Sequence, residues 1–198
     1  MKLSNITVVK INLMQDKTLY TITIFSENTV GLLSQVTSVF VRRQLNIETL
    51  SVSASALEGI HKFTITVFCD EDVVKKVVLQ IDKRVDVLKA YYNTDEELIH
   101  QEIALYKLST PDFLKIESVE ELIRKHNAHI LDINENCVVL EKTGHYKETQ
   151  YLFEELSKSI GVLQFIRSGR IAITKSKVER LSDMLAELDK RHKSQDTN

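Results

Sequence analysis

The sequence has few cysteines, prolines and glycines, and it lacks any long apolar run. Its 198 residues include two cysteines, Cys69 and Cys137, which form no CxxC pair, so the sequence predicts neither a disulfide framework nor a zinc site. We expect each thiol to be a small buried hydrophobic side chain. No apolar stretch approaches the length of a membrane span, and no signal-peptide core follows Lys2. We therefore expect a cytoplasmic protein with no membrane association.

The sequence also lacks a strong excess of one charge and the common catalytic motifs. The net charge is −2 and the pI is about 6.3, with no basic stripe of the kind that binds nucleic acid. No HExxH, GxSxG, P-loop or dinucleotide-binding fingerprint occurs. His126 and His129 are three residues apart, but a helical pattern gives way to a strand pattern between them. We therefore predict no catalytic residue, metal site or cofactor in this chain.

The first half of the chain shows two kinds of hydrophobic periodicity. Apolar residues alternate with polar ones in strands and recur every three or four residues in helices. On this basis we predict strands at 19–25, 46–54, 63–67 and 85–92 and helices at 32–40 and 73–81. Asp70 or Asp72 is in position to cap the second helix. The order β-α-β-β-α-β is that of a ferredoxin-like domain.

The second half repeats this order. We predict strands at 102–108, 130–133 and 138–142, and one more over 163–166 and 171–174 that is interrupted around Ser168-Gly169. Helices are predicted near 117–126 and 152–156, with a final helix over 178–188. The sequence thus predicts an α+β protein with an extension over residues 1–17, a ferredoxin-like βαββαβ domain over 18–95 and a second over 96–198. Three acidic clusters are interpreted as solvated surface, the first as a hinge and the others as exposed helix faces: Asp95–Glu97, Glu120–Glu121 and Glu154–Glu155.

The turn between the first predicted strand and helix contains Gly31, and it has the features of a small-molecule site. Glycine lets a backbone approach a ligand closely, and the first N–H groups of a helix have no partner within it. The helix dipole favours an anion such as a carboxylate at that end. Asn28 offers a donor and an acceptor to an α-amino acid, and Val30 and Leu32 offer apolar surface. The alternative is a plain turn with an Asx-type cap.

Five segments carry a resemblance to a known family. Glu27–Val36 contains an NxxGxLS loop, and Asn46–Leu50 reads as an NIE(S/T)L strand start. Val85–Leu88 looks like a VDVL segment, His100–Leu105 like EREIML, and Arg167–Gly169 like an RSG turn. Together they resemble the small regulatory subunit of acetolactate synthase. The loop is typical of ACT domains in general, and the later segments point to this subunit.

The resemblance implies a regulatory subunit and not an enzyme. Family members activate a separate acetolactate synthase catalytic subunit, which holds thiamine diphosphate, Mg and FAD. They confer feedback inhibition by valine or other branched-chain amino acids, in the biosynthesis of valine, leucine and isoleucine. The effector lies between the ACT domains of a homodimer. Carried over onto this sequence, the effector-binding positions are Asn28, Val30, Gly31, Leu32, Leu33, Asn46 and Ile47.

Other interpretations compete with this one. A stand-alone ACT-domain sensor that regulates another enzyme would carry the same loop, although the segments of the second half favour the synthase subunit. An RNA-recognition domain shares the element order, but the strand around 61–68 lacks the glycines of its base-stacking motif. A metallochaperone would need a CxxC. The chain also departs from the family, because its N-terminal extension is long and Thr29-Val30 replaces a more polar pair.

Overall fold

A computed structural model describes residues 17–115 and 119–175 of the chain. These residues form two compact units, one of residues 17–99 with 172–175 and the other of His100–Ile171. Each is described below by itself. In this described part of the chain, no helix is long and apolar enough to cross a membrane.

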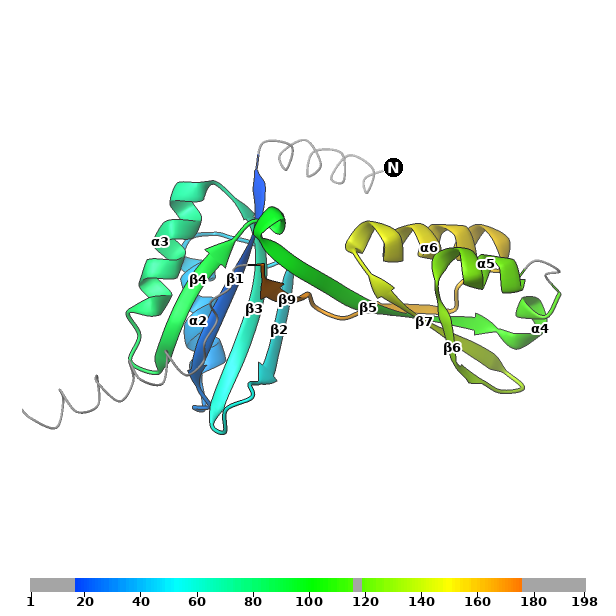
Figure 1. Cartoon of the computed structure of the whole chain (residues 1–198), viewed down its shortest axis with the longest axis horizontal. Helices are drawn as coiled ribbons and strands as arrows, with labels where there is room; N and C mark the ends of the chain where they lie inside the picture. Colours follow the sequence, from blue (N-terminus) through cyan, green and yellow to red (C-terminus); the bar gives the residue numbers. More distant parts are fainter. Residues whose placement is uncertain (1–16, 116–118, 176–198) are drawn as a thin grey trace, which may run out of the picture. The chain divides into compact units, whose positions relative to one another are not determined.

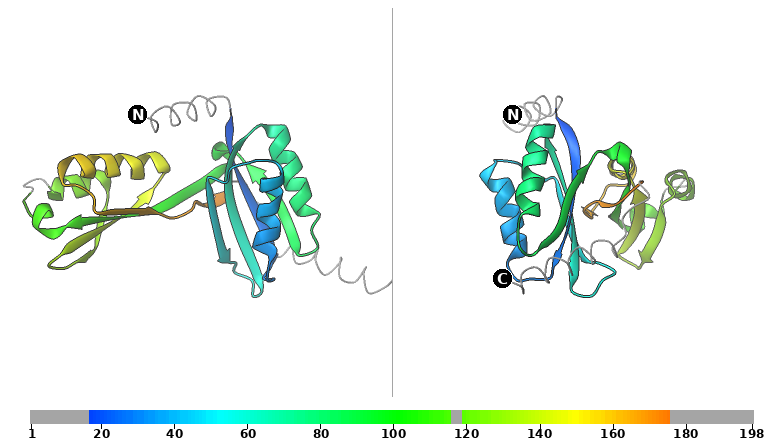
Figure 2. Two further views of the ribbon diagram at one scale, coloured as in Figure 1. Left: turned by 180° about the vertical axis from the view of Figure 1, so that it is seen from behind. Right: turned by 60° about the vertical axis from the view of Figure 1, so that its left-hand side comes forward.

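The N-terminal unit is an antiparallel four-stranded sheet with two helices on one face (Figures 1 and 2). The strand order is β2-β3-β1-β4, which is the ferredoxin-like order expected from the sequence. The elements are β1 (Thr18–Glu27), α2 (Leu32–Arg42), β2 (Thr49–Ala54), β3 (Ile60–Cys69), α3 (Glu71–Asp82), β4 (Val87–Asn93) and the 3₁₀ turn η1 (Asp95–Glu97).

The core of this unit follows the predicted periodicities. Ile22 and Ile24 of β1 and Ile65 of β3 are fully buried, and they pack against the apolar stripes of α2 and α3. The other face of the sheet carries a threonine ladder, since Thr21 lies opposite Thr66 and Thr23 opposite Thr64 in the β1–β3 register. All four threonines are buried. One sheet face is therefore apolar, and the other combines these small hydroxylated side chains with a separate apolar cluster around Phe25.

The C-terminal unit repeats the topology. Its sheet has the order β6-β7-β5-β8, with β9 also paired to β5, and α5 and α6 pack on one face of it through the core cluster that they share with β5 and β7 (Figure 1). The elements are β5 (Leu98–Ser109), α4 (Thr110–Phe113), α5 (Val119–His126), β6 (His129–Ile133), β7 (Cys137–Gly144), α6 (Tyr146–Ser159) and β8 (Gln164–Arg167). The strand β9 (Ile171–Thr174) follows them, and from residue 172 on it belongs to the N-terminal unit.

This second core contains charges as well as apolar side chains. The inward positions of β5 run from Glu102 through Ala104 and Tyr106 to Leu108, and all are buried. The Glu102 carboxylate accepts a hydrogen bond from Thr149 Oγ1 at 2.6 Å and forms an ion pair with Arg167 Nε at 2.9 Å. Burial raises the pKa of Tyr106, whose hydroxyl donates to the Thr149 carbonyl at 2.7 Å. The core is therefore closed by a polar network at one end.

Several local predictions need correction. Leu33, which the periodicity assigns to the buried stripe of its helix, is 46% exposed. Asp70 occupies the N-cap position of α3, yet its side chain makes no capping hydrogen bond within the described residues. Asp95–Glu97 is exposed, as expected of a solvated segment, and it forms a 3₁₀ turn in which the Glu97 carboxylate accepts the Thr94 amide at 2.9 Å. Glu155 does not lie on a freely exposed face of its helix, because its carboxylate contacts Lys125 and His126.

Other predictions are confirmed or lie outside the described residues. Cys69 is buried as expected, whereas Cys137 is only half-buried, and both are free thiols. His126 ends α5 and His129 begins β6, so the two histidines do not share a helix face. The extension over 1–16 and the final helix over 178–188 lie outside the described part of the chain.

Candidate functional site

The candidate loop connects the end of β1 to the start of α2. Its backbone is fixed at both ends, because the Asn28 amide donates to the Gly59 carbonyl at 2.9 Å and the Gln35 amide to the Gly31 carbonyl at 3.1 Å. Gly31 is the N-cap residue of α2 with φ of +89°. Residues that carry a side chain rarely adopt this left-handed backbone conformation, so the backbone itself requires glycine here.

The start of α2 is open to a ligand. No side chain caps it among the described residues, so the alternative of an Asx-type cap is wrong. Its first turn, Leu32 to Ser34, contains no acidic residue either. A Cβ built on Gly31 would have no atom of residues 17–115 and 119–175 within 4 Å. The positive end of the helix dipole therefore faces open space that can receive an anion.

The side chains around this space combine polar and apolar character. Val30 is fully exposed and Leu33 is 46% exposed, whereas Leu32 is 2% exposed and ties the loop to the core. Asn28 is exposed as well, and within the described residues its side-chain amide has no hydrogen-bond partner. The loop thus presents one free amide and two apolar side chains beside the helix start, and Leu32 contributes only its backbone.

Asn46 and Ile47 lie at the opposite end of α2. The helix has 11 residues and so spans about 16 Å at 1.5 Å per residue. Asn46 Nδ2 donates to Glu48 Oε1 at 2.8 Å, and Ile47 packs against the core of the N-terminal unit. A single chain therefore does not bring Asn46 and Ile47 to the Gly31 loop. A site containing both groups needs two chains.

A second polar region, which sequence reasoning missed, lies in the C-terminal unit. Arg167 stacks with its guanidinium carbon 4.1 Å from the centre of the Tyr146 ring and pairs with Glu102. Lys142 is 6% exposed, because β7 places positions 138, 140 and 142 on its inward side. That alternation is visible in the sequence, and it marks a lysine where an apolar residue is expected. Among the described residues, no cluster of three or more metal-ligating side chains occurs.

The fold and the loop together define a class of protein. Two βαββαβ units, the first with a glycine N-cap at an uncapped helix start, describe a two-domain protein with an N-terminal ACT-type domain. Residues 22–89 match the family model described as AHAS small subunit-like ACT domain. Residues 101–176 match the model described as small subunit of acetolactate synthase.

Named relatives cover most of the chain. A probable acetolactate synthase small subunit of Archaeoglobus fulgidus is 30% identical over 156 residues, covering 79% of this chain and 96% of that protein. The acetolactate synthase small subunit of Bacillus subtilis is 27% identical over 162 residues, covering 81% and 93%. The crystal structure of the Thermotoga maritima small subunit has a TM-score of 0.72 at 22% identity, covering 81% and 99%. The chain belongs to the acetolactate synthase small-subunit family.

Proposed function

We propose that this chain is the non-catalytic regulatory subunit of an acetolactate synthase in the cytoplasm. It activates a catalytic subunit, which holds thiamine diphosphate, Mg and FAD, and it confers feedback inhibition by valine. The observation that supports an amino-acid effector is the open start of α2 at Gly31, with the free Asn28 amide beside it.

The loop offers each part of valine a chemically matched contact. The effector carboxylate accepts from the first-turn amides of α2, where the helix dipole favours a negative charge. The Asn28 side-chain carbonyl accepts from the effector's ammonium group. Val30 and Leu33 cover the aliphatic side chain, which explains why two apolar residues are exposed here.

The second half of the site comes from the partner chain of a homodimer. In an isologous dimer each contact occurs twice, so Asn46 and Ile47 of one chain face the Gly31 loop of the other. The strand β2 supplies an available edge, since in the described sheet it pairs only with β3. An effector bound at this seam stabilises one dimer geometry, and the catalytic subunit responds through its different affinity for the two geometries.

The selectivity of such a site is limited. Valine and isoleucine differ by one methylene, which an apolar pocket distinguishes by about 1–3 kcal/mol. We therefore expect isoleucine and leucine to bind more weakly than valine without being excluded.

The test is Gly31→Asp in the complex reconstituted from this chain and its catalytic subunit. The new carboxylate repels that of the effector, so we expect activation to persist while valine inhibition is lost. Gly161→Asp is the matched control, since Gly161 has φ of +84° but lies in the C-terminal unit. Asn28→Ala should abolish valine binding measured by calorimetry. Valine inhibition retained in Gly31→Asp would overturn the site.

A stand-alone amino-acid sensor is the second candidate, because the loop alone fits it equally well. The two functions differ in their partner. A regulatory subunit raises the activity of the purified catalytic subunit and co-elutes with it in gel filtration, whereas a sensor of another enzyme does neither.

A further inference from the structure

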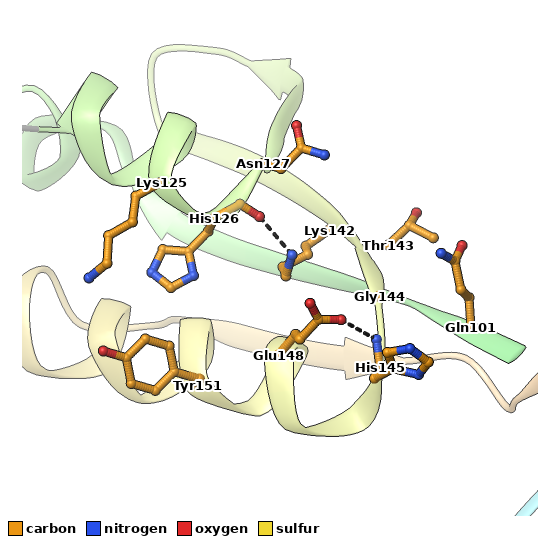
Figure 3. Close-up of a pocket in the computed structure, with 10 residues that line it drawn as sticks. All are labelled: Gln101, Lys125, His126, Asn127, Lys142, Thr143, Gly144, His145, Glu148 and Tyr151. Atoms are coloured by element: carbon orange, nitrogen blue, oxygen red, sulfur yellow. Dashed lines mark hydrogen bonds between the residues drawn. The ribbon is translucent and has the colours of Figure 1, made fainter. Parts of the chain in front are cut away.

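The C-terminal unit contains a cavity of about 600 Å³ that lies outside the proposed effector site. Cavities of this size hold small metabolites in other proteins. It opens between the end of α5, the end of β7 and the first two turns of α6 (Figure 3). Its lining residues are Gln101, Lys125, His126, Asn127, Lys142, Thr143, Gly144, His145, Glu148 and Tyr151.

One wall carries a buried ammonium group with hydrogen-bonding capacity to spare. Lys142 is 6% exposed, and its Nζ donates to the carbonyl of His126, the last residue of α5, at 2.6 Å. An ammonium group has three N–H donors, and this carbonyl is the one acceptor that the described residues provide. A buried charge with unused donors is unfavourable. We therefore expect oxygen atoms of a molecule in the cavity to accept from the two remaining N–H donors of Lys142.

The facing wall carries a carboxylate held in place by the start of α6. Glu148 Oε2 accepts the His145 amide at 2.7 Å, and its other oxygen has no hydrogen-bond partner among the described residues. Gly144 makes this arrangement possible, because a Cβ there would lie 2.7 Å from Glu148 Oε2. Figure 3 shows Lys142 and Glu148 extending into the same space from β7 and α6. Within the described residues the two groups form no ion pair with each other.

The other charged groups of the lining already have partners. Lys125 Nζ lies 2.8 Å from Glu155 Oε1, and His126 Nε2 lies 2.8 Å from Glu155 Oε2. Glu155 thus compensates the Lys125 charge and hydrogen-bonds the His126 ring, and it stands outside the lining. The cavity is left with one positive and one negative group whose capacity is unfilled, and this combination suits neither a simple anion nor a simple cation.

We propose that this cavity is a second amino-acid site, which binds a zwitterion carrying a polar side chain. The ligand carboxylate accepts from Lys142, and the ligand ammonium donates to Glu148. Apart from Tyr151 and the paired Lys125, the other side chains of the lining are amide, hydroxyl and imidazole groups, including those of Gln101, Asn127 and Thr143. Such groups match an amide side chain of the size of glutamine, whereas an aliphatic side chain leaves them unpaired.

The test is titration of the full-length chain with L-glutamine, followed by backbone amide NMR shifts at residues 142–148 and by calorimetry. We expect saturable shifts there and none at residues 28–34. N-acetyl-L-glutamine lacks the ammonium group and L-glutaminamide lacks the carboxylate, so each should bind at least tenfold more weakly. Because the N-terminal loop takes no part, Asn28→Ala should leave glutamine binding within twofold.

Variants separate binding from folding. Glu148→Gln keeps the capping geometry, since glutamine also serves at this helix position, and it should weaken glutamine binding about tenfold or more. Glu154→Gln is the matched control on the same helix, because Glu154 lies outside the cavity and contacts Gln150. Equal shifts with inorganic phosphate alone would show an anion site and overturn the proposal. So would unchanged affinity in Glu148→Gln, or the absence of saturable shifts at millimolar glutamine.

Discussion

The two units share one topology but treat their helix ends in opposite ways. In the N-terminal unit α2 starts at a glycine with no capping side chain in the described chain. In the C-terminal unit Lys142 closes the end of α5, and Glu148 closes the start of α6 through a capping box with His145. An uncapped helix start stays available to a ligand or a second chain. The two proposed sites follow this difference, since the N-terminal one uses backbone amides and the C-terminal one uses side chains.

The cores of the two units differ too, because among the described residues only the C-terminal one buries charged side chains. The N-terminal sheet buries apolar residues on one face and threonines on the other, whereas the C-terminal sheet buries Glu102, Lys142 and the largely covered Arg167. A buried ion pair contributes little net stability, but its loss leaves a charge without compensation. We therefore expect the C-terminal unit to be the more sensitive of the two to single charge changes.

The largest expected effect comes from Arg167→Met, which leaves the Glu102 carboxylate buried without its cation. We expect a loss of about 3 kcal/mol in the free energy of unfolding, measured by urea denaturation and by hydrogen exchange of β5 amides. Arg43→Met in the N-terminal unit removes an exposed guanidinium that contacts Gln80 and should cost less than about 0.5 kcal/mol. The double variant Glu102→Gln/Arg167→Met should recover most of the loss. Equal effects of the two arginine changes would remove the contrast between the cores.

A smaller effect separates the two helix-terminal glycines. Gly31 starts α2 with φ of +89° and Gly161 follows α6 with φ of +84°, and in the described chain neither has an atom near a built Cβ. Alanine at either position should cost about 1 kcal/mol of stability from backbone strain alone. Only Gly31→Ala places its methyl group in the proposed effector space, so it alone should weaken valine binding in calorimetry. Weakened valine binding in Gly161→Ala as well would show that the loss of binding in Gly31→Ala results from lower stability and not from the methyl group in the site.

The fold could be predicted from the sequence because both halves keep clean periodicities. The alternation in β3 and the stripe of Val74, Val77 and Ile81 in α3 give the correct elements. The stripe of α3 also gives its buried face, whereas in β3 the intervening Thr64 and Thr66 are buried as well. Leu33 breaks the pattern, since an apolar residue at a helix start is expected to face the core. Its exposure becomes meaningful only together with the loop geometry.

The sites were less accessible to sequence reasoning. Gly31 could be singled out because a glycine between a strand and a helix usually marks a special backbone conformation or a close approach of another group. The cavity could not, because it depends on a lysine from β7 reaching the end of a helix 16 residues earlier. The box formed by His145 and Glu148 was also hidden, since histidine replaces the usual serine or threonine at the cap. The alternation of β7 marks Lys142 as an inward position, but its partner elsewhere in the fold leaves no local pattern.

A modest pH effect should distinguish the units further. Hydrogen bonds, first with Lys125 and then with His126, lower the pKa of Glu155 in the folded protein. The ionised carboxylate therefore contributes its full amount to the free energy of unfolding above the unfolded pKa of about 4.3. That contribution is lost as the pH falls through the lower, folded pKa. Because the side chain is 29% exposed, we expect less than about 1 kcal/mol. Glu155→Gln should flatten the stability of the C-terminal unit between roughly pH 5 and pH 3.

The matched carboxylate in the N-terminal unit is Glu71. A hydrogen bond from Lys75 lowers its pKa, but the pair sits one helical turn apart on the surface of α3. Glu71→Gln should therefore change the acid transition less than Glu155→Gln, measured by urea melts at each pH. A larger effect of Glu71 would contradict the view that tertiary ion pairs are concentrated in the C-terminal unit.

The smallest expected effect tests the helix starts directly. Asp70 stands at the N-cap of α3 without a capping side-chain bond in the described structure, and the helix is held by backbone bonds from Val73 and Val74 to the Asp70 carbonyl. Asp70→Ala should therefore cost less than about 0.5 kcal/mol, mainly through the helix dipole. Glu148→Ala, which removes the acceptor of the His145 amide, should cost about 1 kcal/mol. Urea midpoints measure both. A loss of about 1 kcal/mol or more in Asp70→Ala would mean that its side chain caps α3 in solution, because the dipole alone cannot supply so much at an exposed site.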